Sequence, residues 1–437
     1  MEELSLVAIF LFVLFLLLGT GVWVGLALLG VAYVGMELFT GRPVGPAMIT
    51  TLWSTASAWT LTALPLFIWM GEILYRTRLS QDMFAGLAPW LRRLPGGLIH
   101  TNILGCTVFA AVSGSSAATL TTVGKMSIPE LRRRRYPEHM VVGTLAGAAT
   151  LGLMVPPSLI LIVYGVTINE SISKLFIAGV LPGLVLASMF MGYAALYAAF
   201  ARDWNPVREA AMGWRERIAS ARLLLPVLLL VLFVIGSMYL GFATATEAAA
   251  FGVAGALVLA ASQGALTWRS FRASLMGAVH TSAMVALILA GAAFLTLAMG
   301  FTGLPRALAG WIADLELSRF ALLLALMLFY IVVGCFLDGI SAVVLTMAVV
   351  EPMVRQAGID MIWFGIFVVV VVEMAQITPP IGFNLFVLQG MTDHEIGYVA
   401  RAALPMFVIM VVMVFVLIAV PELATWLPAQ MSAARGG

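Results

Sequence analysis

Charged side chains are scarce in this chain. Of its 437 residues only 10% are Asp, Glu, Lys or Arg, whereas 62% are hydrophobic. Soluble globular domains carry about a quarter of charged residues, so the composition excludes an ordinary soluble protein and indicates one that lies in the lipid bilayer. The formal net charge is only +2. The chain therefore has no electrostatic basis for binding a nucleic acid, a polyanion that proteins neutralise with many Lys and Arg residues.

Cysteine and histidine are nearly absent as well. The chain has two cysteines and four histidines, and none shows the spacing of metal ligands. Cys106 and Cys335 lie in apolar stretches, where we expect them to be small buried hydrophobic residues. No GxxxxGK[ST] sequence occurs, which argues against an ATP-driven pump. No pairing of a nucleophile with a base suggests an enzyme.

Long apolar stretches fill most of the remaining length. A stretch of about 20 apolar residues crosses a bilayer as a helix, so the sequence predicts an all-α polytopic membrane protein. The first stretch, Leu4–Leu18, follows Glu2 and Glu3, where a cleaved signal peptide would carry positive charge. We therefore expect it to be a retained helix.

Two of the expected membrane helices contain a pair of adjacent prolines. The pairs are Pro156 and Pro157 within residues 140–166, and Pro379 and Pro380 within residues 362–389. Proline lacks the backbone N–H and clashes with the preceding turn, and in hydrocarbon the freed carbonyl groups need another partner. Helices broken at bilayer depth bind substrate and ions in secondary transporters. One such pair could be a plain kink, but two in equivalent positions favour a transporter.

The chain is predicted to consist of two similar halves, residues 1–218 and 219–437. The first half would contain scaffold helices within 4–75, an amphipathic arm at 80–95, a re-entrant helical hairpin at 97–128, a broken helix at 140–166 and a helix at 175–200. The second half would repeat this order, with scaffold helices within 223–300, an arm at 305–315, a hairpin at 320–350, a broken helix at 362–389 and a helix at 402–420.

The spacing of prolines supports the repeat. The first proline of each pair is followed 26 residues later by another proline, Pro182 in one half and Pro405 in the other. Each half is expected to have five crossings and one hairpin. An odd number of crossings turns the second half upside down relative to the first, which is the inverted-topology repeat of secondary transporters.

Positive charge predicts the orientation. Lys and Arg are enriched in cytoplasmic loops, and 17 of the 23 fall into five predicted loops: 76–98, 125–139, 201–222, 262–275 and 390–401. With these loops inside, both termini are periplasmic, and the protein is a multi-pass protein of the bacterial cytoplasmic (inner) membrane.

Hydroxyl groups and unwound backbone are expected to gather at the two hairpin tips and the two breaks. Oxygen ligands without Cys or His suit a hard cation such as Na⁺, and half-helix N-termini favour an anionic solute. The candidate Na⁺ ligands are Ser113, Ser115, Ser116, Val155, Ser158, Asp338, Gly339, Ser341 and Thr378. The candidate solute contacts are Ser116, Thr119, Pro156, Pro157, Pro379, Pro380 and Asn384. The alternative is that these small residues only pack helices together.

Several motifs are similar to those of a known family. The chain resembles the large membrane subunit of tripartite ATP-independent periplasmic (TRAP) transporters, of the dicarboxylate and sialic-acid type. The matching sequences are Leu64-Pro-Leu-Phe-Ile-Trp-Met-Gly-Glu72, Val112-Ser-Gly-Ser-Ser-Ala117, Val155-Pro-Pro-Ser158, Thr244-Ala-Thr-Glu-Ala-Ala249 and Thr378-Pro-Pro-Ile-Gly382. Ala245 departs from the pattern, because the family usually has proline there.

This resemblance implies Na⁺-driven uptake of a small organic acid that a periplasmic solute-binding protein delivers. It also implies an elevator movement of the hairpin-bearing part against a fixed scaffold, and a small four-helix membrane subunit. Since the sequence begins at the first helix of the large subunit, we expect that partner to be a separate polypeptide.

Other functions stay open from the residues alone. Proton coupling through Asp338 or Glu373 is an alternative to Na⁺ coupling, because acids inside a membrane are usually functional. A stand-alone anion or carboxylate symporter is another alternative. A channel would need a continuous polar pore, whereas the polar groups here are confined to the tips and breaks.

Overall fold

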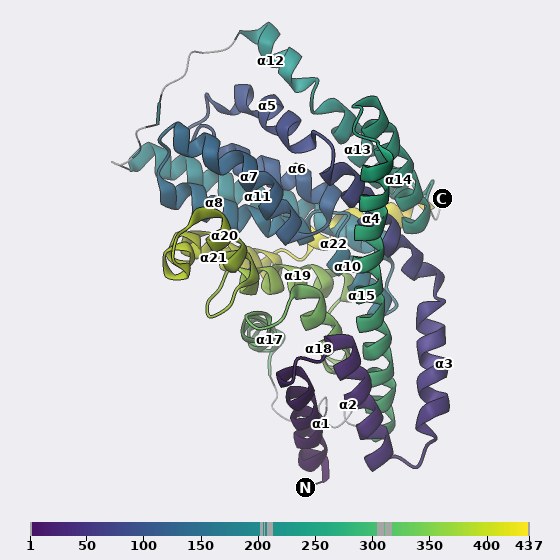
Figure 1. Ribbon diagram of the computed structural model, residues 1–437. Helices are drawn as coiled ribbons and strands as arrows, with labels where there is room; N and C mark the ends of the chain where they lie inside the picture. Colours follow the sequence, from purple (N-terminus) through teal and green to yellow (C-terminus); the bar gives the residue numbers. More distant parts are fainter. Residues whose placement is uncertain are drawn as a thin grey trace.

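The computed structural model describes residues 2–201, 204, 206–207, 213–303, 310 and 317–435. Every regular element in these residues is helical (Figure 1). Up to residue 201 the helices are α1 (Glu2–Gly19), α2 (Val24–Phe39), α3 (Val44–Ala56), η1 (Trp59–Thr62), α4 (Ala63–Tyr75), α5 (Leu79–Leu91), α6 (Ile99–Ser113), α7 (Ser116–Arg133), α8 (Glu138–Ala149), α9 (Leu151–Met154), α10 (Leu159–Thr167) and α11 (Ile172–Phe200).

The rest of the described chain is equally helical. Its helices are α12 (Trp214–Ala221), α13 (Leu225–Tyr239), α14 (Ala245–Ser262), α15 (Trp268–Thr302), α17 (Arg319–Gly334), α18 (Gly339–Gln356), α19 (Met361–Gln376), α20 (Phe383–Thr392), α21 (Ile396–Ala419) and α22 (Glu422–Arg435). In the described residues, 5 helices are long and apolar enough to cross a membrane, or up to 8 if each bent helix pair is one span. The protein is therefore a multi-pass membrane protein.

Some elements differ from the sequence-based expectation. Residues 262–275 were expected to be a loop, but α15 starts within them at Trp268, where the Thr267 hydroxyl caps it by accepting from the backbone N–H of Ser270 at 3.1 Å. Two amphipathic helices, α12 and α22, were not expected at all. The last part of the expected scaffold of the first half, Val44–Tyr75, is bent by 51° between α3 and the η1–α4 segment. The second arm, 305–315, lies almost entirely outside the described residues.

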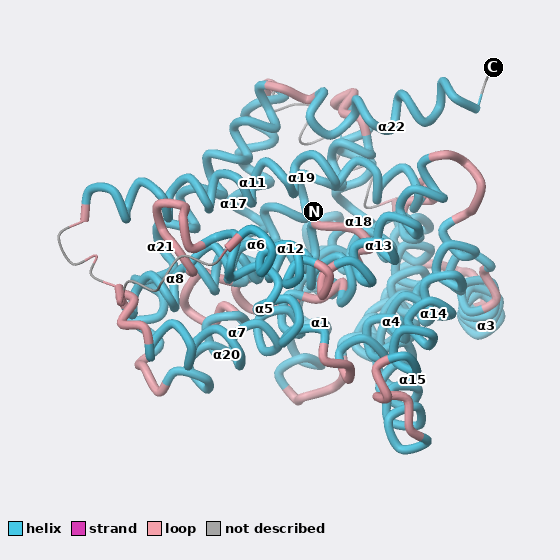
Figure 2. Tube along the Cα trace, turned by 90° about the horizontal axis from the view of Figure 1, so that it is seen from above, coloured by secondary structure: helices cyan, strands magenta, loops and turns pink. Residues whose placement is uncertain are grey.

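One group of helices forms an interlocked bundle along one side of the molecule. Figures 1 and 2 both show α15 beside α4 and α14, away from α8, α20 and α21. Helix α2 packs against α15, and α4 packs against α14. Counted as crossings, α2 and α14 are the second of their halves, and each contacts the third crossing of the other half, which is α15 for α2 and α4 for α14. At the first of these crossings a Cβ on Gly291 would lie 2.5 Å from the carbonyl oxygen of Gly25, so the two backbones nearly touch.

The remaining helices exchange partners in the same way. Helix α8 packs against α21 and α11 against α19. The short helix after each proline pair packs against the helix that follows the opposite tip, α10 against α18 and α20 against α7. The two halves are therefore built into one core rather than standing side by side as separate domains.

The first arm lies against the hairpin of its own half. Helix α5 contacts α6 and α7, and also the unexpected helix α12. The indole Nε1 of Trp90 donates to the carbonyl of Arg217 at 3.2 Å, and the rings of Trp90 and Trp214 meet edge to face. The apolar face of this amphipathic arm is thus partly covered by α12.

Candidate functional site

The first tip is a short reversal between α6 and α7. Gly114 ends α6 with φ +60°, a conformation that glycine adopts at little cost. Ser115 then caps α7, its hydroxyl accepting from the backbone N–H of Ala118 at 3.4 Å. The hydroxyls of Ser113 and Thr119 are hydrogen bonded across the tip at 2.8 Å. Three of the predicted hydroxyl residues of this half therefore lie together.

This tip covers the first helix break. The backbone N–H of Leu159 donates to the Gly114 carbonyl at 3.4 Å. Pro157 cannot serve the carbonyl of Leu153, four residues before it, because it has no N–H. The buried Ser158 hydroxyl donates to that carbonyl instead, and it also caps α10. The Ser158 hydroxyl thus replaces the backbone hydrogen bond that is lost at the break. Both prolines are buried.

The second tip lies between α17 and α18. Asp338 caps α18, one carboxylate oxygen accepting from the N–H groups of Ile340 and Ser341, each at 3.1 Å. Its side chain is exposed. Gly339 and Ser341 belong to the first turn of α18 rather than to an unwound tip. The Ser341 hydroxyl is 1% exposed and has no hydrogen-bond partner among the described residues.

The second break is more open than the first. Pro379 and Pro380 are exposed, while Pro156 and Pro157 are buried. The thiol of Cys335, at the second tip, donates to the carbonyl of Pro379 at 3.5 Å. The Thr378 hydroxyl donates to the backbone carbonyl of Met374 at 2.7 Å. The two sites are thus alike in plan but differ in how deeply they are covered.

Asn384 is the most unusual polar residue near the second break. It lies one residue into α20, which starts after Gly382 at φ +51°. Its side chain is completely buried, and neither its amide nitrogen nor its oxygen has a hydrogen-bond partner in the described chain. Buried polar groups without partners are costly and need an explanation. A bound solute or ion would supply one.

The last turn of α19 touches both tips. The Ser116 hydroxyl donates to Oε2 of Glu373 at 2.7 Å, across the two halves. Three residues further on, Nε2 of Gln376 donates to the carbonyl of Leu337 in the second tip at 3.4 Å. A Cβ on Gly339 would meet Val372 of α19 at 3.0 Å and Ile160 of α10 at 3.4 Å. This turn therefore joins the two tips, a contact that no local sequence pattern predicts.

The other intramembrane acids have local roles. Glu247 accepts from both the N–H and the hydroxyl of Thr244 at 2.8 Å, so it caps α14. Glu72 pairs with Arg76, and Glu351 pairs with Arg355 at 2.9 Å. Capping and pairing account for these carboxylates without a bound ion.

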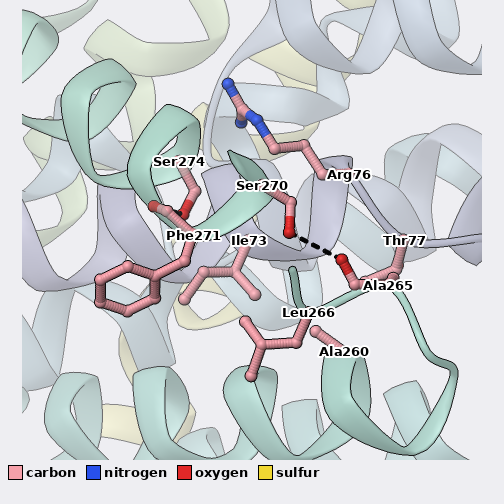
Figure 3. Close-up of a pocket in the computed structure, with 9 residues that line it drawn as sticks. All are labelled: Ile73, Arg76, Thr77, Ala260, Ala265, Leu266, Ser270, Phe271 and Ser274. Atoms are coloured by element: carbon pink, nitrogen blue, oxygen red, sulfur yellow. Dashed lines mark hydrogen bonds between the residues drawn. The ribbon is translucent and has the colours of Figure 1, made fainter. Parts of the chain in front are cut away.

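A separate hollow lies at the end of α4. It has about 200 Å³ of space, including its open mouth, and is lined by Ile73, Arg76, Thr77, Ala260, Ala265, Leu266, Ser270, Phe271 and Ser274 (Figure 3). The Ser270 hydroxyl in it donates to the Ala265 carbonyl at 2.7 Å. None of the tip or break residues lines this hollow, so it is not part of the candidate site.

The sequence was then compared with known proteins. Residues 11–423 match the family described as "Tripartite ATP-independent periplasmic transporter, DctM component". The chain belongs to this family of TRAP transporter permeases. The resemblance inferred from the motifs is thereby confirmed, and the family is one of transporters rather than enzymes.

Two relatives and one solved structure illustrate the range. The chain is 33% identical to a C4-dicarboxylate TRAP transporter large permease protein of Pseudomonas aeruginosa, over 86% of this chain and 88% of the relative. It is 30% identical to an isethionate TRAP transporter permease protein, DctMQ, of Oleidesulfovibrio alaskensis, over 94% of this chain and 64% of that longer protein. The crystal structure of the Alcanivorax borkumensis YdaH transporter has a similar fold, with a TM-score of 0.66 at 15% identity, over 92% of this chain and 96% of the other.

Proposed function

We propose that this TRAP permease is the translocation subunit of a secondary transporter that imports a small organic acid. A Na⁺ gradient drives the import, which occurs by an elevator movement. The observation that carries the proposal is the pair of sites in which a hairpin tip meets a proline-broken helix. The exchange of packing partners between the halves supports an inverted repeat, because a two-fold pseudosymmetry axis would produce such reciprocal contacts.

Negative charge on the solute is supported by four helix starts. Helices α7, α10, α18 and α20 all begin at a tip or just after a break. A helix N-terminus carries roughly half a positive charge, and of these four starts α20 has no side-chain cap on its N–H groups. The relatives named for C4-dicarboxylate and isethionate carry anions of this kind. The solute would contact Thr119, both proline pairs and Asn384, whereas Ser116 would be left to the ion.

Na⁺ is the coupling ion that the donor groups fit best. The hydroxyls of the first tip, the backbone near Val155 and the Ser158 region would form one site. Asp338, Gly339, Ser341 and Thr378 would form the other. These donors are oxygen atoms, which suit a hard cation, and the buried Ser341 hydroxyl lacks a protein partner.

The elevator is supported by the division of the helices into two groups, one of which contains the tips and breaks. In the scaffold group the backbones of α2 and α15 nearly touch. The tips and breaks lie in the other group and meet the scaffold through α4, which contacts α6 and α10, and through α15, which contacts α18. Both termini would lie on the periplasmic side of the inner membrane. A periplasmic solute-binding protein would deliver the solute, and a separate small four-helix membrane subunit would enlarge the scaffold.

Reconstitution tests the proposal. The permease, its small subunit and its binding protein would be assembled in liposomes, and uptake of radiolabelled C4-dicarboxylate or isethionate measured. We expect uptake with an inward Na⁺ gradient and none with a proton gradient in Na⁺-free buffer. Equal uptake with the proton gradient alone would contradict Na⁺ coupling. Full-rate uptake by the permease alone would contradict the three-component arrangement and favour a stand-alone symporter.

A further inference from the structure

Glu373 is the one buried acidic residue in the part of the chain that the structure describes. Its side chain is 1% exposed. No Lys, Arg or His of the described chain pairs with it, and its Oε1 atom has no hydrogen-bond partner. Its single recorded hydrogen bond is the one that Oε2 accepts from Ser116. A carboxylate in this position would be unstable unless something else compensates its charge.

The hydrogen bond to Glu373 has a consequence for Ser116. An ionised carboxylate can only accept hydrogen bonds, and a serine hydroxyl has one hydrogen and two acceptor lone pairs. Once that hydrogen is directed to Glu373, the Ser116 oxygen can act towards a third group only as an acceptor. Such an oxygen suits a cation and cannot donate to an anionic solute.

The second half lacks this arrangement. Counted from the helix cap, which is Ser115 in the first tip and Asp338 in the second, the position of Ser116 is held by Gly339. The residue that lies six positions before the first proline pair, as Glu373 lies before the second, is Thr150. Its hydroxyl donates to the Gly147 carbonyl at 2.6 Å and faces Met410. Gly339 has no hydroxyl for such a carboxylate to orient, so the two tips are not chemically equivalent.

We propose that Glu373 is a positioning residue of the first ion site, and that it acts from the opposite half of the chain. By accepting the Ser116 hydrogen, its carboxylate fixes the Ser116 oxygen as an acceptor for Na⁺. The bound cation in turn compensates the buried carboxylate. The ion and the link between the halves therefore stabilise one another. This inference rests on the proposed Na⁺ coupling and adds to it a residue outside both tips.

A double-mutant cycle tests the inference. Glu373→Gln, Ser116→Ala and the double variant would be measured in the reconstituted complex, with uptake rate recorded against Na⁺ concentration. Loss of an outer partner of a metal ligand typically weakens metal binding about 10-fold to 100-fold. We expect each single variant to raise the half-saturating Na⁺ concentration by about this factor, while the solute KM at saturating Na⁺ stays near the wild-type value.

The double variant gives the decisive comparison. If Glu373 acts through Ser116, the second substitution adds little to the first. Glu351→Gln is the matched control, since it removes the same charge from an acid that pairs with Arg355 near the end of α18. It should leave the Na⁺ dependence unchanged. Na⁺-dependent thermal stabilisation of the purified complex provides a second readout for variants that are assembled but do not transport.

Three outcomes would overturn the inference. A Na⁺ dependence of Glu373→Gln equal to that of the wild type would show that Glu373 does not position the ligand. Fully additive effects of the two substitutions would show that it does not act through Ser116. Wild-type uptake that is independent of Na⁺ would remove both this inference and the proposed coupling. The wild-type measurement thus separates failure of the proposed function from failure of the role of Glu373.

Discussion

At the scale of single residues, two acids near the candidate site differ in their surroundings. Asp338 is exposed and uses its carboxylate to cap α18, whereas Glu373 is buried and accepts a single hydrogen bond. Transfer of an acid to the middle of a membrane helix costs about 2.5–3.5 kcal/mol. That cost applies to Glu373 far more than to Asp338, because Glu373 is buried and caps no helix. A compensating cation therefore matters more for Glu373.

Substitution of Asp338 separates its capping role from a role in ion binding. Asparagine caps helices about as well as aspartate, while alanine costs about 1 kcal/mol. We expect Asp338→Asn to keep the wild-type melting temperature and to weaken Na⁺ dependence. Asp338→Ala should lower both, as measured by thermal unfolding and by uptake. Wild-type Na⁺ dependence in Asp338→Asn would show that the carboxylate is only a cap.

The sequence predicted which residues gather at each tip better than it predicted their neighbours across the halves. Serines near a glycine and hydroxyls near a proline pair are local patterns, and the caps formed by Ser115 and Ser158 follow from them. The bond between Ser116 and Glu373 joins residues 257 positions apart. No local pattern reports such a contact, and only the packing of α19 between the two tips creates it.

At the scale of helices, close crossings join the halves. A Cβ on Gly143 of α8 would lie 2.1 Å from the carbonyl oxygen of Ala402 in α21. The two helices can therefore pack this closely only because residue 143 has no side chain. Glycine is common at such crossings in membranes, where small residues let backbones approach. This crossing aligns the first broken helix with the last long helix of the chain.

Enlarging Gly143 should therefore separate these two helices. Overpacking costs typically 1–3 kcal/mol, so we expect Gly143→Ala to lower the melting temperature of the purified complex. Gly192→Ala in α11 is the matched control, because nothing lies within 4 Å of a Cβ there. That control should be neutral or slightly stabilising, since alanine favours a helix by about 1 kcal/mol over glycine. Equal melting temperatures for both variants would contradict the close crossing.

Helix existence was predicted well from apolar length, and helix ends less well. The basic residues Arg269 and Arg272 suggested a loop, yet both lie on the exposed side of α15. Helix α22 was missed because it is amphipathic and too short and polar to read as a crossing. Its buried residues Ala424 and Met431 are covered once the helix packs on α11 and α19. Burial by distant helices, rather than local composition, decides such segments.

At the scale of the whole molecule, the predicted orientation can be tested by chemical labelling. Arg133 and Arg355 are surface residues, with side chains 71% and 46% exposed. We expect a cysteine at position 133 to react with a membrane-impermeant thiol reagent only from the cytoplasm, and one at position 355 only from the periplasm. Labelling of both from the same side would contradict the inverted repeat. The native cysteines are buried and should give little background.

The length of α15 has a consequence for the membrane around the protein. Its 35 residues extend about 52 Å at 1.5 Å per residue, while the hydrocarbon layer is about 30 Å thick. The excess has to be accommodated by tilt or by projection into the headgroup region, where the exposed Trp268 and Arg269 at its start would be anchored. Since α2 and α4 are packed against this helix, a change in its tilt would be transmitted to the whole bundle. Acyl-chain length, rather than lipid charge alone, would then influence how easily the two groups of helices slide past one another.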